Sequence, residues 1–378
     1  MLYTAAGLML AACSPKNTSI EVVNPLPFDR NAELVSAPVS SANLGKLVDA
    51  DGNEVAYQVK GDEILFQASV PAVSTATYTM LASEPASEVE PLTTAFFLGD
   101  RRKDDFCWEN DKAAYRMYGP ALLPENPSSG VDLWLKHSSQ LAADAMYRQE
   151  EGGKPYHVDY GLGIDSYKVG HAAGCGGVAI YTADGQIWPG GPFKTWEILQ
   201  EGPLQTIFRL TYDSVQVADK VWNEVITITV NAGAQVNKAE VCFTGEPVEG
   251  AMIGGAYFHH DDPSVDLSEK VNDYQIIACA EPATSDKGIY RVHEQMGIDA
   301  TTLDFGRNYV AVIVPGAEAT GVAGATEYAV KNYEMGQTVT YYFGGGWSKR
   351  DYATDDEWFN ATRQTAASIA TPLIVKVK

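Results

Sequence analysis

The sequence predicts an all-β protein built mainly from antiparallel strands, and three observations support this. Apolar and polar residues alternate in many short runs, turn-forming residues separate those runs, and helical periodicity is scarce. Alternation with a period of two places one face of each strand against a core. We therefore expect a small N-terminal β-sandwich followed by a large two-sheet β-sandwich of galactose mutarotase-like type, with a few short helices.

The first part of the chain is typical of a bacterial lipoprotein signal. Residues 2–12 form a short apolar run that ends in Leu-Ala-Ala directly before Cys13. The run is too short to span a bilayer, and small residues before a cysteine that becomes acylated are the mark of such signals. Because no basic residue precedes the run, we expect the natural chain to begin a few residues earlier. The prediction is signal and tether over residues 1–19 and an extracytoplasmic protein, in the periplasm or on the outer membrane, that meets the membrane only through this lipid anchor.

The next region, residues 20–83, alternates in runs about ten residues apart and is predicted to be the small β-sandwich. Turn residues punctuate it at 49–53 and 60–62. Residues 84–91 are polar and contain two prolines, as expected of an interdomain linker.

The large sandwich, with the expected catalytic function, is predicted over residues 92–378. Its clearest strands are expected at 206–212, 223–230, 239–243, 309–314 and 338–343, and its best helical candidates at 130–145 and 355–367.

Composition narrows the range of partners. With 27 Lys and Arg against 49 Asp and Glu, the formal charge is −22, which works against nucleic acid or an anionic membrane surface as partner. An anionic ligand therefore needs a local basic pocket. No GxSxG, P-loop or complete GxGxxG motif is present, which sets aside the serine hydrolase, P-loop and dinucleotide-binding classes. The spacing of Cys107, Cys175, Cys242 and Cys279 does not indicate zinc bound by cysteines, and it leaves disulfide pairing and oligomeric state open.

The segment from 157 to 177 is the strongest candidate site. It holds two histidines, two tyrosines, two aspartates and six glycines. Such a glycine content favours a loop that presents His157, Asp159, Tyr160 and Tyr167 to a ligand. The alternative is a series of tight turns with surface histidines.

Three further groups of residues are candidates for binding or catalysis. Around residues 105–120, Trp108, Glu109 and Asn110 are placed to line a sugar cleft, although Trp108 in the core with the acids paired to nearby cations is an equal alternative. After an apolar strand, Trp347, Lys349 and Arg350 are placed to hold a uronate ring, or else to cap a hairpin.

The pair His259 and His260 ends another strand, so at most one of them reaches a given site. The local ligands do not define a metal site, and no cofactor is predicted, with a divalent metal left as the alternative.

Together the segments 108–111, 115–120, 157–177 and 345–348 resemble a family of Bacteroidetes lipoproteins from polysaccharide-utilisation gene clusters, whose domain is uncharacterised. The resemblance spans most of residues 92–378. It implies the galactose mutarotase-like β-sandwich and a relation to a dehydratase that acts on ulvan oligosaccharides.

The main functional hypothesis is β-elimination of water or a glycosidic leaving group from a uronate-containing oligosaccharide. This chemistry needs a cation to neutralise the uronate carboxylate, a base and an acid. We expect Arg116 as the cation and His157 as the base, with His259 or His260 competing, and Tyr160 or Tyr167 as the acid.

Two alternatives remain. One is a glycoside hydrolase that uses two carboxylates from among Glu109, Asp111, Asp159 and Asp165. The other is a glycan-binding surface lipoprotein without chemistry, in which Trp108 and Trp347 stack on sugars.

The enzyme hypothesis carries a spatial expectation. His157, Arg116, one of His259 and His260, and Trp347 should converge on one concave face, with the small domain adding only a wall.

Overall fold

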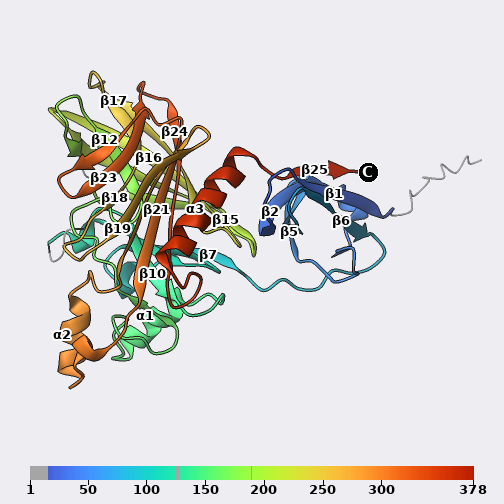
Figure 1. Cartoon of the computed structure of the whole chain (residues 1–378), viewed down its shortest axis with the longest axis horizontal. Helices are drawn as coiled ribbons and strands as arrows, with labels where there is room; N and C mark the ends of the chain where they lie inside the picture. The colour runs from blue at the N-terminus through green and yellow to red at the C-terminus, as the bar shows by residue number, and fades with distance from the viewer. Residues whose placement is uncertain (1–15, 125–127, 189) are drawn as a thin grey trace, which may run out of the picture.

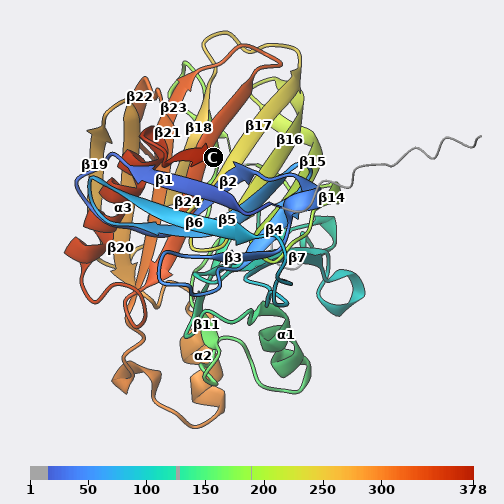
Figure 2. The same cartoon turned by 90° about the vertical axis from the view of Figure 1, so that its right-hand side faces the viewer.

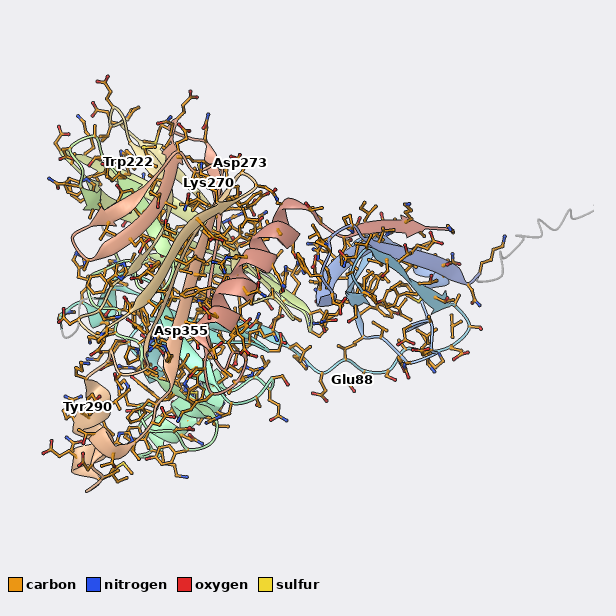
Figure 3. All side chains as sticks on the ribbon, viewed as in Figure 1. Glu88, Trp222, Lys270, Asp273, Tyr290 and Asp355 are labelled. Atoms are coloured by element: carbon orange, nitrogen blue, oxygen red, sulfur yellow. The ribbon has the colours of Figure 1, made fainter. Side chains whose placement is uncertain are left out.

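The computed structural model describes residues 16–124, 128–188 and 190–378. The expected lipidation site Cys13 and most of the expected signal lie outside these residues. Two β-rich parts are joined by an extended segment on which Glu88 is labelled (Figures 1 and 3). In the described residues, no helix is long and apolar enough to cross a membrane.

The small part is a sandwich of two antiparallel sheets, with the orders β25-β1-β6-β3 and β2-β5-β4. Its core contains Ile20, Val22, Phe66 and Met80, all fully buried on the alternating faces of their strands. The strands are β1 (Thr18–Asn24), β2 (Arg30–Pro38), β3 (Lys46–Val48), β4 (Tyr57–Lys60), β5 (Glu63–Val70), β6 (Ser74–Leu81) and β25 (Ile374–Val377).

The C-terminal strand β25 changes the expected boundaries. It pairs with β1 from Ile20↔Val377 to Val23↔Ile374, and Leu373 joins the small core. The small sandwich is therefore not built from residues 20–83 alone, and the large one does not extend to residue 378. The tether is also shorter than expected, because β1 begins at Thr18. β25 gives β1 a second paired neighbour and so removes an open edge.

The large part is organised around one eight-stranded antiparallel sheet, with the order β14-β15-β16-β17-β24-β21-β20-β19. Figures 1 and 2 show its long strands side by side. These strands are β14 (Thr195–Gln200), β15 (Gln205–Val217), β16 (Lys220–Asn231), β17 (Asn237–Gly245), β19 (Val265–Val271), β20 (Tyr274–Pro282), β21 (Arg307–Pro315) and β24 (Thr338–Trp347).

Two five-stranded sheets complete the large part, with the orders β11-β10-β9-β8-β7 and β13-β12-β18-β23-β22. Their strands are β7 (Thr93–Phe97), β8 (Asp105–Asn110), β9 (Ala114–Tyr118), β10 (Asp132–Lys136), β11 (Gly163–Asp165), β12 (Gly177–Tyr181), β13 (Ile187–Trp188), β18 (Met252–Phe258), β22 (Ala319–Ala323) and β23 (Thr326–Asn332).

Both five-stranded sheets pack on the same face of the eight-stranded sheet. Trp108 of β8 lies with its ring 5.0 Å from that of Phe208 on β15. The hydroxyl oxygen of Tyr257 on β18 lies 3.4 Å from the carbonyl oxygen of Ala278 on β20. The predicted all-β sandwich is confirmed, and its second layer is divided into two sheets.

The helices are few and short, as predicted. They are α1 (Ala143–Glu151), α2 (Gly288–Gln295) and α3 (Asp355–Ala370), with 3-10 turns at Ser41–Asn43, Gly99–Arg101, Pro120–Leu122 and Ala300–Thr302. The side chain of Thr354 accepts from the backbone N–H of Glu357 and caps α3. α3 covers the outer face of the eight-stranded sheet, where Trp358 stacks on Tyr309 (Figure 1).

The helix expected at 130–145 is wrong over most of its length. Residues 132–136 form β10, whose side chains are all buried. A strand covered on both faces loses its alternating pattern, so periodicity could not distinguish it from a helix.

Candidate functional site

Arg116 is at the centre of a buried charge cluster. It lies on β9, is 6% exposed, and donates to the carboxylates of three aspartates. The distances are 2.8 Å to Asp132, 3.3 Å to Asp105 and 3.1 Å to Asp165. The guanidinium is thus neutralised by the protein's own acids and has no free face for a substrate carboxylate. The expected role of Arg116 as the uronate-neutralising cation is therefore wrong.

Burial is the main influence on the pKa values of Asp165 and Asp105 in this cluster. It raises the pKa of Asp165 well above the ordinary value, with Asp132 raising it further and Arg116 opposing. Burial also raises the pKa of Asp105 against the opposing effect of Arg116. One carboxylate oxygen of each of these two aspartates has no hydrogen-bond partner within the described residues. The three carboxyl groups of the cluster thus outnumber Arg116, the buried cation that they share.

His157 borders this cluster and opens toward the surface. Its Nδ1 lies 2.9 Å from the backbone carbonyl oxygen of Asp165. A carbonyl can only accept, so Nδ1 carries the proton and Nε2 has the lone pair in the neutral ring. Nε2 has no partner among the described residues and faces Gly288, where an added Cβ would lie 3.6 Å from it. The side chain is 17% exposed.

His259 and His260 are each tied to a buried glutamate. His259 Nε2 lies 2.9 Å from Glu327. His260 Nδ1 lies 2.9 Å from Glu281, and its Nε2 lies 2.7 Å from the carbonyl oxygen of Lys168. Burial opposes the charged form of His260, but the hydrogen bond and charge of Glu281, the carbonyl of Lys168 and the charge of Asp262 together outweigh it, and the pKa of His260 is raised.

The bond to Glu327 likewise raises the pKa of His259. Because both nitrogens of His260 are engaged, it is held as a cation and does not fit the role of a base.

The tyrosines of the candidate loop differ in access. Tyr167 is buried, its hydroxyl faces the carbonyl oxygen of Phe258, and its ring meets His260 edge-on. Burial raises the pKa of Tyr167 well above its usual value, so it does not fit the role of the acid. Tyr160 is partly exposed, and the amine of Lys154 lies 5.5 Å from its ring.

Most of the predicted substrate-binding residues have structural roles, which corrects those assignments. Trp108 is fully buried, and Trp347 is 2% exposed with its indole N–H bound to Phe305. The carboxylate of Glu109 pairs with Lys136 and accepts from the backbone at the start of α1.

The remaining predicted residues also contact the protein itself. Asn110 donates to the carbonyl oxygens of Asn231 and Ala234. Arg350 donates to backbone carbonyls at 111–112, and Lys349 donates to that of Asp304. Hydrogen-bonding capacity used in this way is not available for a sugar.

Asp159 remains accessible at the edge of the loop. It lies 2.5 Å from His137, whose ring packs 4.6 Å from that of Trp347. His157, Arg116 and His260 all contact the segment 165–168. Trp347 contacts His137, which in turn binds Asp159 of the candidate loop. We call His157, His259 and His260 the histidine cluster.

The glutamate partners of the histidine cluster could not be predicted from local sequence. Glu281 and Glu327 are more than twenty residues from the histidines they contact, and only the strand order brings them close. The same holds for a hollow of about 500 Å³ between the small sandwich, α3 and the turn at 233–238. The residues lining that hollow include Tyr342, Tyr352 and Arg30 but no histidine.

The fold and the histidine cluster define a two-part β-sandwich protein in which titratable groups from distant segments contact residues 165–168 of the large part. The chain belongs to the family described as Domain of unknown function (DUF4861), whose model matches residues 22–375. Uncharacterized protein P7 of Formosa agariphila is 25% identical over 426 residues, which cover 100% of this chain and 99% of that protein.

Two solved structures share the fold. An alpha-mannosidase from Enterococcus faecalis V583 aligns with a TM-score of 0.52 and 9% identity, over 96% of this chain and 46% of that one. A glycosyl hydrolase family 38 protein from Enterococcus faecalis aligns with a TM-score of 0.50 and 8% identity, over 96% of this chain and 47% of that one. The chain thus spans less than half of each, and the likeness concerns the fold alone.

Proposed function

We propose that this protein is a carbohydrate-active enzyme that removes water or a glycosidic leaving group from a uronate-containing oligosaccharide by β-elimination, with His157 as the base. The observation that carries the proposal is the state of the His157 ring. Its proton is fixed on Nδ1 by the carbonyl oxygen of Asp165, and its Nε2, which has no partner among the described residues, faces Gly288 on a side chain that is 17% exposed.

The other two members of the histidine cluster are weaker candidates for the base. His260 uses both nitrogens within the protein, and His259 binds Glu327 through Nε2 and faces Asp266 through Nδ1. Proton abstraction from a sugar carbon requires a nitrogen that a substrate can reach.

Three exposed lysines on the same segments supply the local basic surface that an anionic substrate needs. Lys154 precedes the segment 157–177 and Lys168 lies within it, and Lys287 precedes Gly288, which His157 faces. In place of Arg116, we assign the binding of the uronate carboxylate to this basic surface, in which Lys287 is the least available because Asp262 binds its amine at 2.7 Å. Tyr160 is the better candidate acid, because Tyr167 is buried.

The hydrolase alternative has less support. Two of its four carboxylates are already bound by buried cations, Glu109 by Lys136 and Asp165 by Arg116. Such a carboxylate cannot act as nucleophile or base without breaking its ion pair.

Incubation of the protein with a panel of uronate oligosaccharides, followed by mass spectrometry, tests the proposal. We expect either loss of one water or cleavage without addition of water, with the ultraviolet absorbance of a conjugated unsaturated uronate. Cleavage with addition of water would establish the hydrolase instead. Binding with full recovery of unchanged sugar would establish the glycan-binding alternative. Both of these outcomes contradict elimination.

The proposal places the enzyme outside the cytoplasm, anchored through lipid on Cys13. The resemblance to lipoproteins of polysaccharide-utilisation gene clusters and the apolar run before Cys13 support this location. Metabolic labelling of the full chain with a fatty acid analogue, compared with Cys13→Ala, tests it.

A further inference from the structure

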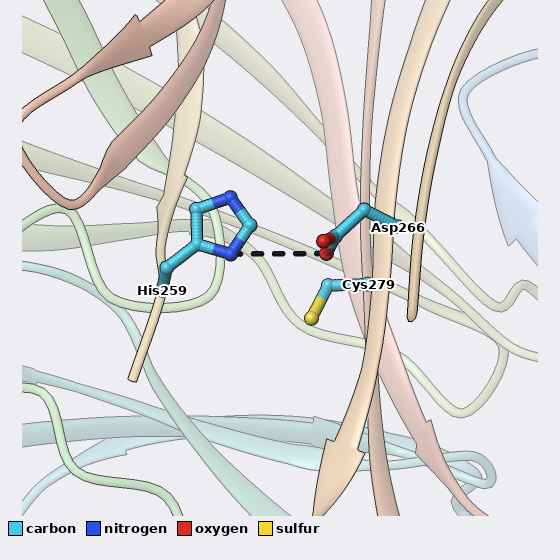
Figure 4. Close-up of side chains that lie close together, drawn as sticks. All are labelled: His259, Asp266 and Cys279. Carbon is cyan, nitrogen blue, oxygen red and sulfur yellow. Dashed lines mark ion pairs between the residues drawn. The ribbon is translucent and has the colours of Figure 1, made fainter. Parts of the chain in front are cut away.

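Three potential metal ligands from different strands meet where the two layers of the large sandwich face each other (Figure 4). His259 directly follows β18 in a five-stranded sheet, whereas Asp266 and Cys279 belong to β19 and β20 of the eight-stranded sheet. Asp266 and Cys279 are direct partners in the antiparallel register. Because β19 is an edge strand, the group lies at an open side of the sandwich.

The spacing of these three residues suits a small cation. One nitrogen, one carboxylate oxygen and one sulfur lie within 4.8 Å of one another. His259 Nδ1 and Asp266 Oδ1 are 3.7 Å apart, which is too long for a hydrogen bond. Two ligand atoms on a tetrahedral zinc ion are roughly 3.5 Å apart, given Zn–N of about 2.1 Å and Zn–S of about 2.3 Å.

A hydrogen bond from the ring nitrogen that faces away from Asp266 and Cys279 fixes the orientation of His259, as is usual for histidines that bind a metal. Its Nε2 lies 2.9 Å from Glu327, and the same carboxylate accepts the hydroxyl of Tyr257 at 2.6 Å. With the Nε2 proton held by a carboxylate, Nδ1 is the nitrogen that turns toward Asp266 and Cys279. A carboxylate–histidine pair of this kind orients the ring and makes it a stronger ligand.

We propose that His259 Nδ1, Asp266 and the thiolate of Cys279 bind one Zn²⁺ ion and leave a fourth position open to water. A thiolate with an imidazole and a carboxylate favours zinc over magnesium or calcium, which prefer oxygen ligands. The thiol of Cys279 gives up its proton as the zinc–sulfur bond forms, and the proton passes to solvent. This site is separate from the base assigned to His157, and either assignment can fail without the other.

Titration of the chelator-treated full-length protein with Zn²⁺ in a calorimeter tests the site. We expect one high-affinity zinc per chain in the wild type and a fall in affinity of at least about 100-fold for Cys279→Ser and Asp266→Ala. Glu327→Gln should lower zinc affinity by about 10- to 100-fold through its effect on His259. Cys242→Ser is the matched control, since it removes another free thiol outside the site.

Wild-type affinity in both Cys279→Ser and Asp266→Ala would overturn the proposal. Cobalt(II) gives a second measurement in the unmutated protein, because a thiolate bound to cobalt adds a charge-transfer band in the near ultraviolet. Bound cobalt without this band would also overturn the site. His157→Ala should bind zinc like the wild type, so loss of turnover in that variant with intact zinc affinity separates the two assignments.

Discussion

The imidazole of His157 donates from Nδ1 to the main-chain carbonyl oxygen of Asp165, 2.9 Å away, and this bond leaves Nε2 as its basic nitrogen. The Asp165 carboxylate meanwhile binds Arg116. One residue thus orients the candidate base through its backbone and completes the buried ion cluster through its side chain.

Replacement of His157 by alanine should lower the rate of elimination by at least about 100-fold, the usual contribution of a general base. The thermal midpoint should stay unchanged, because the side chain is partly exposed and makes one hydrogen bond. Turnover of uronate oligosaccharides and thermal unfolding are the two measurements. His171→Ala is the control, since His171 is exposed in the same glycine-rich segment. A fully active His157→Ala protein would remove His157 from the mechanism.

Replacement of Arg116 by methionine should destabilise the protein rather than weaken substrate binding. It leaves Asp105, Asp132 and Asp165 buried without their shared cation, at a cost of about 3–5 kcal/mol in the free energy of unfolding. Urea denaturation measures this cost.

The control for Arg116 is the double variant Arg116→Met/Asp165→Asn. It should recover part of the loss, because it removes one of the unpaired charges. Unchanged stability in Arg116→Met together with a raised KM would instead restore a substrate-binding role.

Glu224 should make the protein less stable as the pH rises. It lies on β16, is 3% exposed and lines a small cavity with Tyr212 and Met117. Burial alone raises its pKa to about 8 from an ordinary 4.5. The folded state therefore holds a proton that the unfolded state has lost between these values, and stability falls across this pH range.

The expected contribution of Glu224 is roughly 4 kcal/mol between pH 4.5 and pH 8. The variant Glu224→Gln should lose this part of the pH dependence and be more stable than the wild type at pH 8. Urea unfolding at a series of pH values tests this, and parallel curves for the two proteins would contradict it.

Removal of β25 should destabilise the small sandwich selectively. Truncation after Pro372 exposes the edge of β1 and removes Leu373 from the core around Ile20 and Val22. Limited proteolysis should then cut within residues 20–83 sooner than in the wild type. Lys376→Ala, an exposed position on the same strand, is the control. Equal cleavage rates in the truncated and full chains would show that β25 adds nothing.

Local pattern was enough to predict most of the fold. Strands such as 223–230 and 309–314 are predictable because turn residues bound them and alternating or continuous apolar side chains mark their buried faces. The sequence also singled out the segment 157–177, since its density of titratable residues and glycines is itself local. The lipid anchor at Cys13 stays a prediction.

The tertiary structure decided which charges meet. Sequence alone assigns Arg116 to a substrate, because its three aspartates lie in three different segments and local pattern does not identify them as its partners. In the same way, only the register of β19 with β20 and the approach of β18 bring Asp266, Cys279 and His259 together. The alternation that marks a strand is visible in neighbouring residues. The partner of a buried charge depends instead on the order and register of distant strands, which no local pattern contains.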